Sequence, residues 1–247
     1  METQQQSSVT EPQVQRPTKA ALMPIDVLFK KSFDLYKKFL WVFVILAALH
    51  IAIMVGCVIV LALPFLLLFF KQTIALVIVA FLLALAVVVS ATILSLWVKV
   101  SFFVLLKEKD TPLKARQAMA KGWPLVWSYL WVSFLVGLAV GLGTLLLIIP
   151  GIIFAVWFTF SVYILVFEGQ KGTQALRRSR ELVKGYWWPV FGRLCLMFGI
   201  AFLVSRIPSI GFVLNMLFVT PFVLVYHYYL YEDLKNIQSS ALGSQGL

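Results

Sequence analysis

Long runs of apolar residues dominate the chain, and only short polar or proline-containing stretches separate them. About 20 apolar residues are enough for one helix to cross the hydrocarbon core of a bilayer. Runs of about this length predict six membrane-spanning helices. They cover residues 39–62, 74–106, 125–149, 151–167, 187–204 and 208–229. The expected fold class is therefore all-α, a polytopic membrane helix bundle.

Proline marks the break within each pair of apolar runs. Pro64 divides the first long stretch, so residues 64–71 are expected to form an interfacial turn. Pro150 and Pro208, each followed closely by glycine, mark two further turns that resemble each other.

The two ends of the chain differ from the apolar middle. Residues 1–24 are polar and rich in glutamine and proline, a composition typical of disorder, and residues 239–247 are expected to form a short flexible tail. The membrane domain then covers residues 25–238.

Lysine and arginine are distributed unequally between the two ends of the six spans. The loops on one side carry only Lys71 and Arg206. The other side carries Lys30, Lys31, Lys37, Lys38, Lys107, Lys109, Lys114, Arg116, Lys121, Lys171, Arg177, Arg178, Arg180, Lys184 and Lys235. Because basic loops stay in the cytoplasm, both termini are predicted to be cytoplasmic, in a cell's inner (cytoplasmic) membrane.

The composition agrees with a membrane location. The chain is 62% hydrophobic and only 13% charged, whereas soluble domains are close to half apolar and a quarter charged. A net charge of +11 could indicate nucleic acid, but these basic residues flank apolar spans. We therefore expect membrane lipids with anionic headgroups as partners, and no nucleic acid. A protein partner or a homo-oligomer remains an open alternative.

One pattern occurs about three times: a basic segment ends in aromatic residues and leads into a pair of spans. Lys37, Lys121 and Lys184 occupy equivalent positions in the three copies. This internal repeat predicts three pseudo-repeats, each an amphipathic cytoplasmic helix plus a transmembrane hairpin. Such pseudo-symmetry is common in transporters but also follows from simple duplication.

The basic helices allow two interpretations. In the third copy, Leu176, Leu182 and Val183 form an apolar stripe beside several charged residues. Such a helix either lies at the membrane interface and binds headgroups, or only caps the bundle. The candidates for headgroup contact are Lys30, Lys31, Arg177, Arg178, Arg180 and Lys184.

Few ionisable residues occur within the spans, where they are the usual functional candidates. Glu168 and Arg193 are candidates for a structural ion pair, with Arg177 or Arg178 as other partners for Glu168. His50 and His227 are expected to be packed, hydrogen-bonded side chains rather than metal ligands.

Gly137 and Gly141 have the GxxxG spacing that permits close helix approach. They are candidates for helix packing within the bundle, with dimerisation as the alternative.

The chain contains no HExxH, GxSxG or P-loop motif. We therefore expect a protein that is not an enzyme and needs neither a cofactor nor a metal.

Residues 149–193 resemble a known family. Ile149-Pro150-Gly151, the span ending at Glu168-Gly169, and the segments 175–180 and 182–185 are similar to the membrane domain of some glycerophosphoryl diester phosphodiesterases and of related small prokaryotic membrane proteins of unassigned function. Trp157 stands where relatives often carry an arginine. The catalytic domain is absent, so the resemblance implies a prokaryotic inner-membrane bundle associated with lipid and implies no reaction.

Three functions follow as hypotheses. The first is a lipid-associated membrane protein that acts through its basic helices. The second is a transporter or permease subunit for a lipid-like or apolar solute, and the third is a scaffold that acts through residues 1–22.

Overall fold

The computed structural model describes residues 21–68, 74–110, 114–208 and 210–243, and all regular secondary structure in these residues is helical. The first hairpin consists of α1 (Ile25–Leu68) and α2 (Ile74–Lys107). The second unit contains α3 (Ala115–Gly122), a 3-10 turn (Trp123–Leu125), α4 (Val126–Leu146), α5 (Ile148–Phe158) and α6 (Ser161–Glu168). The third contains α7 (Thr173–Val183), α8 (Trp187–Ser205), α9 (Gly211–Leu214), a π-helical turn (Asn215–Val219) and α10 (Thr220–Gly243).

Within the described residues, six helical segments are long and apolar enough to cross a membrane. They are Ile25–Ala62, Ile78–Lys107, Ala115–Leu146, Ile148–Glu168, Trp187–Ser205 and Gly211–Ala241. The predicted fold class, an all-α polytopic membrane protein, is therefore confirmed. Each span coincides with one predicted from the apolar runs, because lipid-facing helices must be apolar along their whole length.

Three local predictions differ from the structure. Helix α1 continues through Pro64 to Leu68, so residues 64–68 are not a turn, and residues 69–71 lie outside the described part. The basic start of α1 is also continuous with the span, rather than a separate interfacial helix. At the other end, α10 includes residues 239–243, which were expected to belong to a tail.

The predicted N-terminal tail lies mostly in residues 1–20, which are outside the described part. Residues 21–24 are not helical, but Met23 is held in place. Its amide donates a hydrogen bond to Asp233 Oδ2 at 2.7 Å, and its carbonyl accepts one from Arg193 Nη2 at 2.7 Å. These two bonds attach the segment before α1 to α10 and α8.

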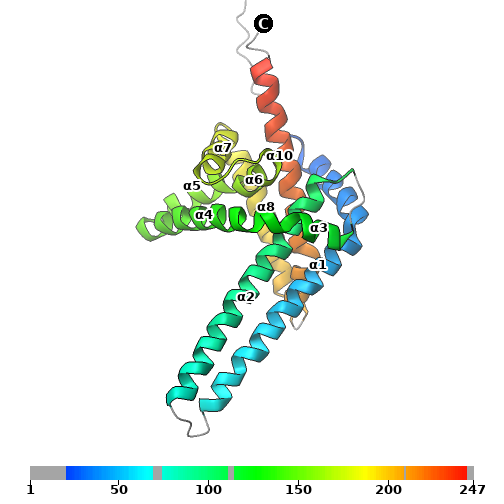
Figure 1. Ribbon diagram of the computed structural model, residues 1–247. Coiled ribbons are helices and arrows are strands. Elements are labelled where there is room, and N and C mark those ends of the chain that lie inside the picture. Colours follow the sequence, from blue (N-terminus) through cyan, green and yellow to red (C-terminus); the bar gives the residue numbers. More distant parts are fainter. Residues whose placement is uncertain (1–20, 69–73, 111–113, 209, 244–247) are drawn as a thin grey trace, which may run out of the picture.

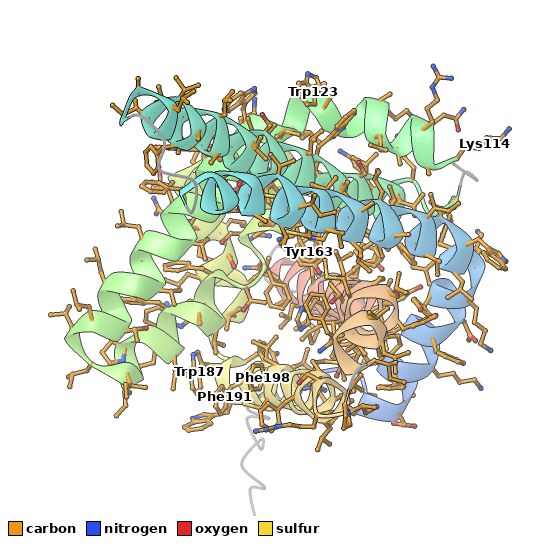
Figure 2. All side chains as sticks on the ribbon, turned by 90° about the horizontal axis from the view of Figure 1, so that it is seen from below. Lys114, Trp123, Tyr163, Trp187, Phe191 and Phe198 are labelled. Atoms are coloured by element: carbon orange, nitrogen blue, oxygen red, sulfur yellow. The ribbon has the colours of Figure 1, made fainter. Side chains whose placement is uncertain are left out.

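The helical hairpins diverge from a common region. Figure 1 shows the α1–α2 hairpin and the α4–α5 hairpin pointing in clearly different directions, with α10 rising on the opposite side of the region where they meet. The view from below shows the same divergence (Figure 2), with Tyr163 between the first hairpin and α10. Tyr163 is 4% exposed, and its hydroxyl donates to Leu224 O at 2.9 Å.

The packed core lies where the hairpins meet. Phe43, Leu105, Ile164 and Tyr226 come from four different helices and are all fully buried there. The tip of the α4–α5 hairpin is apolar but exposed, as at Leu145, where 84% of the residue surface is accessible. An apolar exposed tip is stable only in contact with lipid, so this distribution agrees with a membrane-embedded chain.

Candidate functional site: the basic face

The basic segments gather at one side of the molecule. In Figure 1, α7 and the C-terminal part of α10 lie at the top, and α3 and the start of α1 lie at the right, all away from the tip of the α1–α2 hairpin. We call this side, with the C-terminal ends of α2 and α6, the basic face. Its charged residues fall into two groups, those bonded within the protein and those exposed.

Glu168 is the centre of the first group. It ends α6, and its side chain is only 13% exposed. Tyr231 donates its hydroxyl to Oε1 at 2.7 Å, Arg178 donates Nε to Oε2 at 3.4 Å, and Lys235 Nζ lies 3.8 Å from Oε1. These bonds join α6, α7 and α10, so Glu168 has a structural role.

Two glycines make this arrangement possible. Gly169 and Gly172 flank the short connection from α6 to α7, with φ of +74° and +58°. These left-handed conformations suit glycine, which has no Cβ to clash. They reverse the chain direction tightly enough for Arg178 on α7 to reach Glu168.

The end of α2 is fastened to the same helices. Lys109 Nζ lies 3.1 Å from Glu232 Oε1 and donates to the Tyr228 hydroxyl at 2.9 Å. Lys107 Nζ donates to Val166 O at 2.7 Å. Both lysines, expected only to set the topology, therefore also link the first hairpin to α6 and α10.

Ser179 holds α7 against the break between α5 and α6. Its side chain is fully buried; its hydroxyl donates to Trp157 O at 2.7 Å and accepts from Phe160 N at 3.2 Å. The Arg180 guanidinium lies over the Trp157 ring, 4.4 Å from its centroid. One serine thus stabilises a helix break inside a span, where bulk water cannot satisfy the freed backbone groups.

Arg193 does not pair with Glu168, so that predicted pair is wrong. Arg193 is 8% exposed, and it donates to Pro189 O at 3.2 Å in its own helix as well as to Met23 O. Its position in the middle of α8 directs the side chain to the N-terminal segment rather than to α6. Glu168 instead pairs with Arg178, one of the two other expected partners, and with Lys235.

The second group of charges is exposed. Lys30, Lys31, Arg177, Arg180 and Lys184 are all exposed, whereas Arg178 is partly buried against Glu168. The Arg177 side chain is 84% accessible, with Glu181 Oε1 at 3.3 Å from its Nε. Of the six candidates for headgroup contact, Arg178 is therefore already engaged within the protein.

Helix α7 caps the protein rather than resting its apolar side on lipid. Ala175, Ser179, Leu182 and Val183 form its buried side and belong to, or contact, the packed core. The apolar stripe recognised in the sequence faces the protein, while the basic side faces outward. This geometry leaves electrostatic attraction as the means by which α7 can contact a membrane surface.

Gly137 and Gly141 are not packing sites within the chain, which corrects that prediction. Both are exposed, and a Cβ built at either would meet nothing within 4 Å. The close approach instead joins Gly143 on α4 to Gly151 on α5. A Cβ at Gly143 would lie 3.1 Å from the Gly151 backbone, and one at Gly151 would lie 2.9 Å from the Thr144 backbone.

Ser179, Tyr231 and Glu232 were not singled out in the sequence. The sequence does give a reason to examine Ser179. Helical spacing places it on the same side of α7 as Ala175 and Leu182, so it is a polar residue on an apolar side. The other two lie in an aromatic-rich segment where spacing alone does not identify partners.

The described residues contain no cluster of three or more histidine, cysteine, aspartate or glutamate side chains that could hold a metal ion. Comparison with models of known protein families, with curated proteins and with solved structures found no match. The fold therefore defines the class: an integral membrane protein with six helices able to span the bilayer and a basic face where those helices meet.

Proposed function

We propose that the protein is a non-enzymatic, lipid-associated protein of a cell's inner membrane that binds anionic headgroups with its basic face. The strongest support is that the basic residues form two sets, one paired with acidic residues inside the protein and one exposed. Glu168 and Glu232 neutralise Arg178 and Lys109 inside the protein, whereas Lys30, Lys31 and Lys184 point to the exterior. Exposed cations beside apolar spans lie where lipid phosphates lie.

The experiment compares lipid preference in reconstituted protein. Spin-labelled phosphatidylglycerol and phosphatidylcholine report, by electron paramagnetic resonance, how strongly each lipid associates with the protein in mixed nanodiscs. The variant reverses three charges, Arg177→Glu, Arg180→Glu and Lys184→Glu, and leaves Arg178 in place because it holds Glu168.

We expect the wild-type protein to prefer phosphatidylglycerol and the triple variant to lose this preference by roughly fivefold or more, since each basic residue near an anionic surface contributes about 1 kcal/mol. Salt should weaken the wild-type preference, because exposed charges are screened over about 8 Å at physiological ionic strength. Two single charge reversals are compared as a matched pair: Lys184→Glu, on the basic face, and Arg206→Glu, at the opposite end of α8. Equal lipid preference in wild type and triple variant, both correctly folded, would contradict the proposal.

Transport of a lipid-like solute is the alternative function. It predicts flux of the solute across proteoliposomes, which headgroup binding alone does not produce. The structure offers one feature that bears on a bound amphiphile, a cavity inside the membrane-spanning part.

A further inference from the structure

A cavity of about 170 Å³ lies where the first hairpin, α4 and the π-helical turn meet. Most of its lining is apolar, including Phe102 and Met216, and its polar lining residues include His50, Lys99 and Thr220. None of the described residues that line it is acidic. The volume is close to that of engineered cavities that admit benzene, at about 150 Å³. The cavity can therefore hold a headgroup-sized part of a ligand, but not a whole lipid.

His50 and Lys99 give the cavity its chemistry. His50 is 5% exposed, and its buried Nδ1 has no hydrogen-bond partner; nor has the buried Nε2 of His227, so the prediction that both histidines are hydrogen-bonded is wrong at these atoms. A buried polar atom without a partner costs free energy unless a ligand or water satisfies it. Lys99 is exposed on one side, and none of the ion pairs among the described residues involves it.

The depth of Lys99 distinguishes it from the basic face. It precedes Lys107 on α2 by roughly 12 Å, at 1.5 Å of rise per residue. Lys99 lies within Ile78–Lys107, a segment long and apolar enough to cross a membrane. Cationic side chains within such segments are rare and usually line a site or pair with a partner.

The sixth span is distorted beside the cavity, just before Pro221. Pro221 lacks the N–H that would continue a regular helix, and the preceding turn, Asn215–Val219, is π-helical. Thr220 Oγ1 donates to Asn215 O at 3.0 Å, and Asn215 Nδ2 donates to Ala201 O on α8 at 2.9 Å. These bonds fix the wider turn in place, and Met216, Thr220 and Pro221 line the cavity.

We propose that this cavity binds the acidic headgroup, a carboxylate or a phosphate, of a membrane amphiphile. Lys99 Nζ pairs with the negative charge, and His50 donates Nδ1–H to one of its oxygens. The acyl chain leaves through the open side of the cavity into the surrounding lipid. This site is separate from the basic face, and the proposal does not depend on headgroup binding there.

The test uses the full chain in phosphatidylcholine nanodiscs with three nitroxide-labelled probes: stearic acid, its neutral methyl ester, and phosphatidic acid. Electron paramagnetic resonance measures the fraction of each probe immobilised by the protein. The variants are Lys99→Gln, Lys99→Arg and His50→Phe. Arg206→Gln, which removes one positive charge far from the cavity, is the matched control.

We expect the acids to associate more strongly than the ester. Lys99→Gln should lower acid association by roughly tenfold, the effect of losing a charged hydrogen bond, while Lys99→Arg and Arg206→Gln keep it. His50→Phe should lower it while leaving the charge in place. Stronger association of phosphatidic acid or of stearate supports the site and identifies the headgroup.

Two results would overturn the proposal. One is equal association of stearate and its methyl ester with the wild-type protein. The other is an unchanged acid preference in Lys99→Gln. Because Lys99→Gln should leave the phosphatidylglycerol preference of the basic face intact, failure here is distinguishable from failure of the proposed function.

Discussion

Ser179 shows how much one side chain contributes to this fold. It is the buried hydroxyl between α7 and the α5–α6 break, and it bonds to backbone atoms at Trp157 and Phe160. Helical spacing places it on the apolar side of α7, but spacing does not say which backbone atoms are free to bond with it. Those depend on a break in another helix, so the serine's role required the structure.

Replacing Ser179 with alanine should destabilise the protein by about 1–2 kcal/mol, since two buried backbone groups lose their partner. Unfolding in mixed micelles, followed by tryptophan fluorescence, measures the change. Ser240→Ala removes an exposed serine on α10 and serves as the control. If both variants were as stable as the wild type, Ser179 would not hold the break.

At the scale of the element, the positions of the spans were predictable and their irregularities were not. Apolar length determines where a helix can cross lipid, so all six spans were predicted, with the largest differences at the starts of Ile25–Ala62 and Ala115–Leu146 and at the end of Gly211–Ala241. The break at Phe160 and the π-helical turn before Pro221 depend instead on bonds from Ser179 and Asn215. Such long-range partners leave no periodic pattern in a sequence.

The α4–α5 hairpin illustrates the same limit for glycine. The GxxxG spacing indicated Gly137 and Gly141, but the helices approach each other at Gly143 and Gly151, next to their tight connection. Any glycine permits close approach, and only the geometry of the hairpin determines which one is used.

Gly151→Val should therefore destabilise the hairpin by about 1–3 kcal/mol, because its side chain would overlap the Thr144 backbone. Gly137→Val is the matched control and should change stability little, since space is open there. Thermal unfolding of detergent-purified protein compares the two. Equal losses for both variants would mean that the two helices do not meet at Gly151.

At the scale of the whole molecule, the hairpins meet at the basic face and separate toward their tips. The core and the ion pairs of Lys109 and Arg178 occupy the meeting region, while residues 145–149 at the tip of the α4–α5 hairpin are exposed and apolar. Charge asymmetry in the sequence identified this face, but the internal bonding of its charges followed only from the structure. The proposed headgroup binding requires that the basic face lies on the cytoplasmic side of the membrane.

The orientation is tested most directly by cysteine accessibility in intact cells. Cys57 and Cys195 are first replaced by alanine, and a single cysteine is then placed at Leu147, on the α4–α5 tip, or at Gln174, on α7. A membrane-impermeant maleimide should label the cysteine at Leu147 in intact cells, and the one at Gln174 only after the membrane is opened. Labelling at Gln174 in intact cells would contradict a cytoplasmic basic face.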